Sequence, residues 1–137
     1  IDESYNASPA AMRAAFAVLA MTPPSGAGKR IAILGDMREL GSRGTDLHAE
    51  LADDLLAALP GRVFTVGPLM RALRARLPLA IRGVHGDVSS DIAGVIAAEV
   101  RPGDVLLVKG SLGTNMAPIV AAIEALAEPQ RLLVNRR

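Results

Sequence analysis

The sequence contains no cysteine and no tryptophan, and only two phenylalanines and one tyrosine occur among its 137 residues. The absence of cysteine excludes a disulfide framework and thiolate chemistry. Because aromatic side chains are so few, the core has to be built from alanine, valine, leucine and isoleucine. No apolar run reaches the roughly 18 residues that a membrane-spanning helix needs, and no signal peptide is visible. The composition therefore favours one cytoplasmic domain without membrane insertion.

Charge is nearly balanced, with 15 basic and 14 acidic residues. A nucleic-acid-binding domain normally carries a clustered basic surface, so no nucleic-acid partner is expected. Segment 26–29 (Gly-Ala-Gly-Lys) is faintly similar to a phosphate-binding loop, but it precedes a strand instead of following one, which favours a flexible turn. The sequence also lacks a His/Cys cluster with zinc-ligand spacing and a recognisable Ser-His-Asp set. We therefore expect no metal site within these residues.

Short apolar runs alternate with segments of helical periodicity along the chain. This order predicts an α/β fold with a mainly parallel sheet covered on both faces. Thr45 is the expected cap of the second helix, and either Asp87 or Ser89 caps the fourth. Residues 132–134 fit either a final edge strand or a frayed tail. The predicted strands cover 30–34, 62–66, 81–85 and 105–108, and the predicted helices cover 9–21, 45–59, 68–77, 87–100 and 116–127.

The first nine residues, Ile-Asp-Glu-Ser-Tyr-Asn-Ala-Ser-Pro, place a polar cluster just before a helix. Ser8 is a good N-cap, and Pro9 suits the first helical position, where its missing N–H costs nothing. Polar groups between a strand end and a helix start are where α/β folds bind ligands. Since the chain opens on this cluster and has no initiator Met, we expect a domain taken from a larger protein, with part of the site elsewhere.

The residue types in this opening cluster suit a nucleoside. A carboxylate such as Asp2 or Glu3 can accept two O–H bonds from the cis-diol of a ribose. Tyr5 could lie against a purine ring, and Asn6 could pair with the edge of the base. The alternative is that all four residues serve only the start of the first helix.

A second polar loop follows the first buried strand. Asp36 and Glu39 could bind an ammonium group or a metal, or Asp36 could simply cap the next segment. His48 lies near the start of the following helix, close to this loop. A lone histidine can be a ligand or catalytic group, but it is more often a packing residue. Right-handed crossovers bring this loop and the loops after the other parallel strands to one edge of the sheet.

The loop at 109–115 (Lys-Gly-Ser-Leu-Gly-Thr-Asn) also follows a strand and precedes a helix. Its backbone N–H groups could hold an anion at the helix N-terminus, with Lys109 and Ser111 adding donors. An ordinary strand-to-helix turn would use the same glycine, serine and asparagine residues. From the residues alone, both interpretations stay open.

Taken in order, these motifs resemble the C-terminal domain of the Mur ligases. The resemblance rests on 2–9 (DESYNASP), 34–41 (LGDMRELG), 63–67 (VFTVG), 108–111 (VKGS) and His48, and it covers nearly the whole chain. It implies that residues 1–137 form a single Rossmann-like, doubly wound domain that closes over a central ATPase domain of the same enzyme. Two departures are visible: Ser8 stands where the family usually has Asn, and Glu3 occupies an acidic position that is commonly Asp.

The resemblance is closest to the branch that adds D-alanyl-D-alanine to a UDP-N-acetylmuramoyl tripeptide in peptidoglycan synthesis. It implies ATP and Mg as cofactors, with the phosphates, the metal and a carbamylated lysine held mainly by the central domain, and no catalytic residue in this domain. The isolated domain is then expected to be inactive. The implied nucleotide-binding residues are Asp2, Glu3, Tyr5 and Asn6, and the implied second-substrate residues are Asp36, Glu39, His48, Lys109 and Ser111.

The charges of the second-substrate residues suggest which end of the dipeptide each of them binds. Asp36 or Glu39 suits the ammonium of the incoming dipeptide, whereas Lys109, Ser111 and a helix N-terminus suit its carboxylate. Two alternatives remain. One is another ligase of the same superfamily, of the folylpolyglutamate or cyanophycin type, and the other is a non-catalytic nucleotide- or peptide-binding module.

Overall fold

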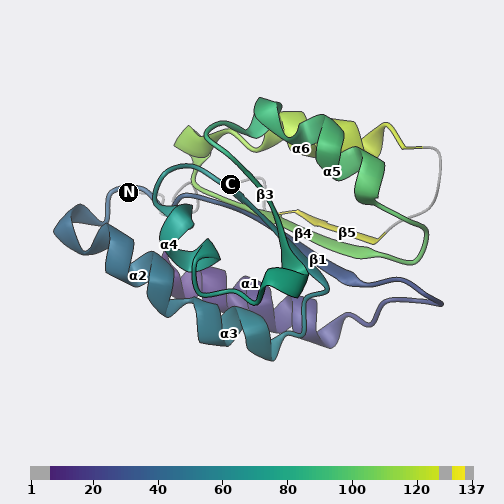
Figure 1. Ribbon diagram of the computed structural model, residues 1–137, viewed down its shortest axis with the longest axis horizontal. Coiled ribbons are helices and arrows are strands. Elements are labelled where there is room, and N and C mark those ends of the chain that lie inside the picture. Colours follow the sequence, from purple (N-terminus) through teal and green to yellow (C-terminus); the bar gives the residue numbers. More distant parts are fainter. Residues whose placement is uncertain (1–6, 127–130, 135–137) are drawn as a thin grey trace.

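The computed structural model describes residues 7–126 and 131–134, which build a five-stranded sheet in the order β3-β2-β1-β4-β5 (Figure 1). Every neighbouring pair of strands is parallel, which confirms the predicted parallel sheet. The final strand resolves the choice left open for 132–134 in favour of an edge strand. The strands are β1 (Arg30–Gly35), β2 (Arg62–Val66), β3 (Arg82–Gly86), β4 (Val105–Lys109) and β5 (Arg131–Val134).

This strand order reverses direction between β1 and β4. From β1 the chain adds β2 and β3 on one side, then returns to add β4 and β5 on the other. In open α/β sheets, the carboxyl ends of the two strands at such a reversal flank a crevice that binds ligands. The loops after β1 and β4 are the segments that the sequence singled out for function.

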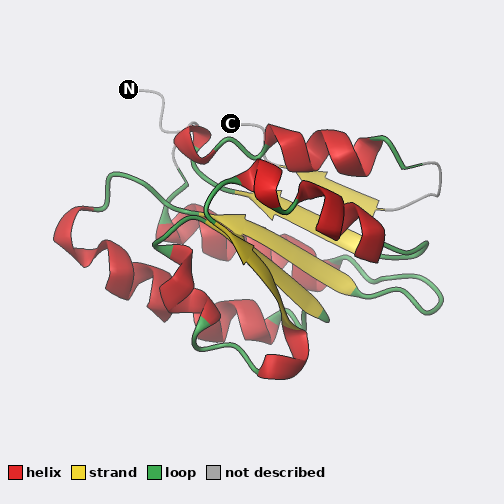
Figure 2. Cartoon of the chain, turned by 45° about the horizontal axis from the view of Figure 1, so that its top comes forward, coloured by secondary structure: helices red, strands yellow, loops and turns green. Residues whose placement is uncertain are grey.

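Helices cover both faces of the sheet (Figure 2). One side, called the α1 face, carries α1 (Pro9–Met21), α2 (Gly44–Glu50), α3 (Ala52–Ala57) and α4 (Met70–Arg74), and the other, the α6 face, carries α5 (Ala93–Glu99) and α6 (Ala117–Glu124). Successive strand residues alternate between these faces. Ala32 and Leu34 therefore pack with Met12, Phe16 and Leu55 on the α1 face, while Ile31 and Ile33 pack with Ile96 and Ile119 on the α6 face.

The start of α1 is as predicted. Ser8 is the N-cap, with its Oγ accepting the Ala11 N–H at 3.1 Å, and Pro9 opens the helix. At the far end, the Arg30 guanidinium donates to the carbonyls of Leu19 and Ala20. The first helix is thus fastened to the sheet at the point where it leads into β1.

The predicted helix over 45–59 was wrong in two respects. It is divided into α2 and α3 at Leu51, whose N–H bonds to the His48 carbonyl while its side chain is fully buried. It also begins at Gly44, so Thr45 lies inside the first turn and caps nothing. The predicted end at residue 59 lies two residues beyond the last residue of α3, and Leu59 itself adopts a left-handed φ of 54° that cannot continue the helix.

The predicted start of the fourth helix also differs, because both candidate capping residues bond to other elements. Neither Asp87 nor Ser89 caps α5: Asp87 pairs with Arg71, and the Ser89 hydroxyl donates to the Asn115 carbonyl at 2.6 Å. The 68–77 helix is reduced to α4, and the 116–127 helix to α6. None of the helices in the described part of the chain is long and apolar enough to cross a membrane.

Candidate functional site

The loops after β1 and β4 are bonded to each other at the sheet reversal. The Asp36 carbonyl accepts the Ser111 N–H at 3.1 Å and the Thr114 hydroxyl at 3.1 Å. In return, the Ser111 Oγ accepts the Arg38 N–H at 2.9 Å. All three bonds would be lost if either loop moved alone, and the Asp36 N–H also donates to the Val66 carbonyl at the end of β2. The two loops therefore form one frame.

The Asp36 side chain extends this frame to a third loop. Its Oδ2 accepts the Leu69 N–H at 3.1 Å and its Oδ1 accepts the Met70 N–H at 2.8 Å, which satisfies the start of α4. Gly67, at φ 100°, leaves room for this carboxylate, since a Cβ there would lie 2.4 Å from the Asp36 Cγ. With only 3% of its surface exposed, Asp36 holds three loops together and offers little to a ligand.

His48 has a similar internal task. Its ring is fully buried, with Nε2 2.9 Å from the Met37 N–H and Nδ1 2.6 Å from the Gly44 carbonyl. A carbonyl can only accept, so Nδ1 carries the proton and donates, while Nε2 accepts. Nε2 therefore fastens α2 to the loop after β1, while Nδ1 bonds within the first turn of α2 itself.

Glu39 differs from these two residues. It is exposed, has a left-handed φ of 63°, and takes part in none of the hydrogen bonds or ion pairs found in the described ranges. A non-glycine residue with positive φ is uncommon and costs conformational energy. Of the two carboxylates predicted in this loop, Glu39 is the one that remains open to a ligand.

Lys109 is buried without a counter-ion. Only 3% of it is exposed, and its ammonium has no acceptor among residues 7–126 and 131–134. Burial lowers the pKa of Lys109 because the charged form loses hydration. By strand alternation Lys109 shares the α1 face with Leu107, and it pairs in register with Leu34. Its neighbour Ser111 is also buried, with its hydroxyl on the Arg38 N–H.

A pocket of about 360 Å³ opens on the opposite, α6 face of the sheet. The side chains that line it are mostly apolar, and Val108 of β4 forms part of its floor. Because Val108 and Lys109 point to opposite faces, the Lys109 side chain does not project into this pocket. The lining residues are Val108, Gly110, Ser111, Leu112, Asn115, Met116, Ala117, Val120, Ala121, Glu124 and Val134.

The structure thus brings together Asp36, His48 and Ser111 as a bonded frame, with Glu39 and Lys109 beside it. The predicted nucleotide residues Asp2, Glu3, Tyr5 and Asn6 lie outside the described residues. Thr114 and Arg38 were not among the predicted site residues, although Arg38 lies inside the 34–41 motif. No group of three or more His, Asp or Glu side chains suited to a metal occurs in the part of the chain that the structure describes.

Comparison with known proteins gives a consistent result. The sequence profile of a family described as Mur ligase, glutamate ligase domain, matches residues 1–112. Similar curated proteins include the UDP-N-acetylmuramoyl-tripeptide–D-alanyl-D-alanine ligases of Rickettsia prowazekii, Escherichia coli and Bacillus subtilis. They are 32%, 30% and 33% identical over 88%, 90% and 88% of this chain. Each match covers 26% of the relative, so the chain spans about a quarter of their length.

Solved structures agree with the sequence matches. A MurF ligase from Thermotoga maritima in complex with ADP is similar at a TM-score of 0.71 and 28% identity. A MurF structure from Acinetobacter baumannii is similar at a TM-score of 0.73 and 27% identity. In both cases the similarity covers 90% of this chain and 27% of the solved chain. The doubly wound, Rossmann-like fold is therefore that of these ligases.

Proposed function

Because this chain belongs to the Mur ligase family, through its glutamate ligase domain, we propose that it is the C-terminal domain of a larger ATP-dependent ligase. The reaction we propose joins D-alanyl-D-alanine to a UDP-N-acetylmuramoyl tripeptide in the cytoplasm. The observation that carries this proposal is the agreement of relatives from three bacteria, all named for that ligase and all matched over nearly the whole chain.

The chemistry proposed for the full enzyme has two steps. The tripeptide carboxylate attacks the γ-phosphate of ATP, which forms an acyl phosphate and releases ADP. The dipeptide amine then attacks the acyl carbon, so a C–N bond forms, the C–O bond to phosphate breaks, and the amine gives up a proton. We propose that Mg and the phosphates are held mainly by the rest of the enzyme, since the described residues offer no metal cluster.

Within this scheme, the domain contributes by positioning. Holding an amine next to an acyl phosphate, with water excluded by domain closure, removes much of the entropic barrier. We propose that Asp2, Glu3, Tyr5 and Asn6 contact the nucleoside. An ADP-bound neighbour of the same fold supports a nucleotide partner.

For the second substrate, we propose that different residues bind the ammonium and the carboxylate of the dipeptide. The open carboxylate of Glu39 suits the dipeptide ammonium, and the Lys109 ammonium, which has no counter-ion among the described residues, suits a carboxylate. Asp36, His48 and Ser111 are proposed to act as positioning residues, because their polar side-chain atoms already bond to the backbone.

The test is ADP release by the full-length enzyme with the UDP-linked tripeptide and ATP. We expect release to depend on D-alanyl-D-alanine, and residues 1–137 alone to be inactive. Dependence on glutamate instead would indicate the folylpolyglutamate branch. Nucleotide binding without any amine-dependent ADP release would indicate a binding module. Dipeptide-dependent ADP formation by residues 1–137 alone would contradict the domain assignment.

A further inference from the structure

Nine of the ten arginines whose side chains the structure describes donate to an acceptor. Arg38 is the exception: no carboxylate or carbonyl within the described ranges accepts a bond from its guanidinium, which is exposed. Among the arginine side chains that the structure describes, Arg38 is therefore unusual. The arginines whose guanidinium donates to a carboxylate or a backbone carbonyl are Arg13, Arg30, Arg43, Arg62, Arg71, Arg74, Arg76, Arg82 and Arg101.

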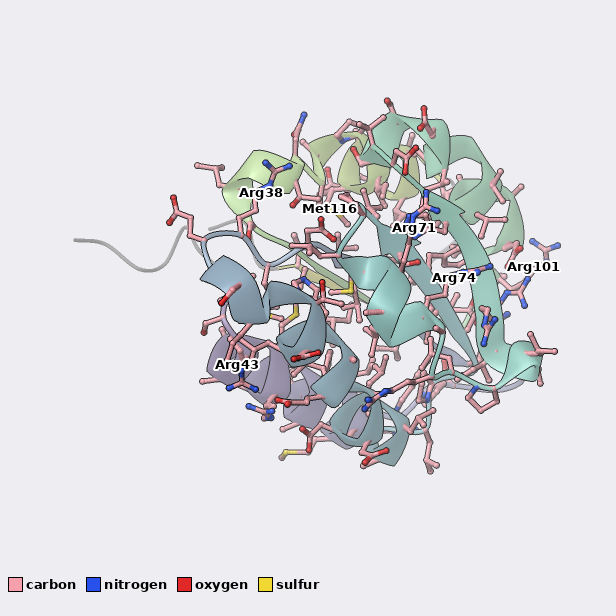
Figure 3. The ribbon with its side chains drawn as sticks, turned by 60° about the vertical axis from the view of Figure 1, so that its left-hand side comes forward. Arg38, Arg43, Arg71, Arg74, Arg101 and Met116 are labelled. Atoms are coloured by element: carbon pink, nitrogen blue, oxygen red, sulfur yellow. The ribbon has the colours of Figure 1, made fainter. Side chains whose placement is uncertain are left out.

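Although its guanidinium is free, Arg38 is held in place. Its backbone N–H donates to the buried Ser111 Oγ at 2.9 Å. Its stem crosses Gly113 so closely that a Cβ on that glycine would lie 3.1 Å from the Arg38 Cδ and 3.2 Å from Nε. Figure 3 shows Arg38 beside the turn that follows β4, on the side of the molecule where the strands end. Less side-chain entropy is lost on binding when the side chain is already held.

Arg38 lies at the carboxyl edge of the sheet, next to the reversal between β1 and β4. It extends from the loop after β1, and the buried Lys109 closes β4, so the two cations flank the sheet reversal where α/β folds bind ligands. The other described lysine, Lys29, pairs with Asp104 at 4.0 Å. Of the lysine and arginine side chains that the structure describes, the two without acceptors thus lie in the loop after β1 and at the end of β4.

We propose that Arg38 is a substrate-binding residue that receives an oxyanion at the sheet reversal; this rests on the proposed function. The planar guanidinium can give two parallel N–H bonds to a carboxylate or a phosphate. In the proposed reaction, that oxyanion is either the terminal carboxylate of the dipeptide or a phosphate from ATP. Glu39, the neighbouring carboxylate, is open and leaves Arg38 free for this role.

The test compares R38A and R38K with R43A in the full-length enzyme. Arg43 is the matched control because it is exposed on the same side of the molecule but already bonds to Glu50 at 3.1 Å. For R38A we expect the KM of the substrate that carries the oxyanion to rise roughly tenfold or more, with kcat less affected. R38K keeps the positive charge but cannot donate two parallel N–H bonds. Its KM should therefore lie between those of wild type and R38A. R43A should stay within about twofold of wild type.

A second arm identifies the oxyanion. Wild type is assayed with D-alanyl-D-alanine and with its C-terminal amide, and R38A is assayed with both. If Arg38 binds the dipeptide carboxylate, wild type prefers the acid and R38A loses that preference. If Arg38 binds a phosphate, the KM for ATP rises and the preference stays.

The outcomes separate the two proposals. Unchanged KM values for all three substrates in a folded, active R38A would overturn the role of Arg38 and leave the ligase function standing. Absence of dipeptide-dependent ADP release in wild type would contradict the ligase function itself, and the Arg38 assignment with it.

Discussion

The Asp36 carboxylate accepts the Met70 N–H at 2.8 Å across 34 residues of sequence. This bond joins the loop after β1 to the first turn of α4, and the Asp36 carbonyl joins the same loop to Ser111. One residue therefore connects three loops at the carboxyl edge of the sheet.

Asp36→Asn should destabilise the domain by about 1–3 kcal/mol, because the amide keeps one acceptor and places N–H groups against a backbone N–H. The free energy of unfolding of the 137-residue chain in urea measures this. Asp53→Asn is the control, since Asp53 is exposed in α3 and should change stability by less than about 0.5 kcal/mol. Equal effects of the two substitutions would contradict a special role for Asp36.

Two glycine substitutions should have opposite signs. Gly67→Ala would put a Cβ 2.4 Å from the Asp36 Cγ at φ 100°, so we expect a loss of more than about 2 kcal/mol. A Cβ at Gly94, in the first turn of α5, would meet nothing within 4 Å, so Gly94→Ala should add up to about 0.5–1 kcal/mol. Thermal unfolding of the two variants checks the pair. A stable Gly67→Ala would mean that the carboxylate can move aside freely.

Burial of Lys109 predicts a specific pH dependence. Its pKa is lowered in the folded state, so between that value and the ordinary lysine pKa the unfolded chain binds more protons. The contribution of Lys109 to stability should therefore rise with pH across this window. Lys109→Met should abolish the rise and leave stability at pH 7 unchanged or higher, measured by urea unfolding at pH 7 and at alkaline pH. Lys29→Met removes a half-exposed lysine instead, and the stability of this variant should still rise with pH as in wild type.

Ser111→Ala should weaken the same substrate interaction as R38A. Removing the Oγ takes away the acceptor of the Arg38 N–H, so the arginine is less well held. We expect a smaller increase in the same KM, of about threefold to tenfold. Leu112→Ala is the neighbouring control, because Leu112 is 62% exposed. An increase in the KM of a different substrate would indicate that Ser111 acts independently of Arg38.

The sequence was informative wherever the signal is local. Ser8 followed by Pro9 predicts a helix start from adjacent residues, and uninterrupted apolar runs such as 105–108 predict buried parallel strands. The break at Leu51 could not be foreseen, because continuous helical periodicity runs through it while the His48 ring bonds back to Met37 and Gly44. That geometry depends on tertiary packing, which overrides local preference.

The candidate site was harder to predict for the same reason. Asp36 and His48 have the residue types of ligands, but Asp36 bonds to the start of α4 and His48 bonds to Met37 in the loop after β1. The face of the sheet on which Lys109 lies follows from the alternation of side chains along β4 and could have been derived from the sequence. Arg38 differs from the other described arginines only in lacking an acceptor, and that difference depends on tertiary contacts that local sequence does not encode.

Gly67 and Asp36 form a unit in which one residue has no side chain so that the other can reach α4. Among related chains, the two positions should vary together: a side chain at 67 is compatible only with a shorter or absent carboxylate at 36. Where both change, α4 needs another acceptor for its first N–H groups. The identity of residue 67, which touches no proposed ligand, is therefore a marker for how the three loops are joined in each member of the family.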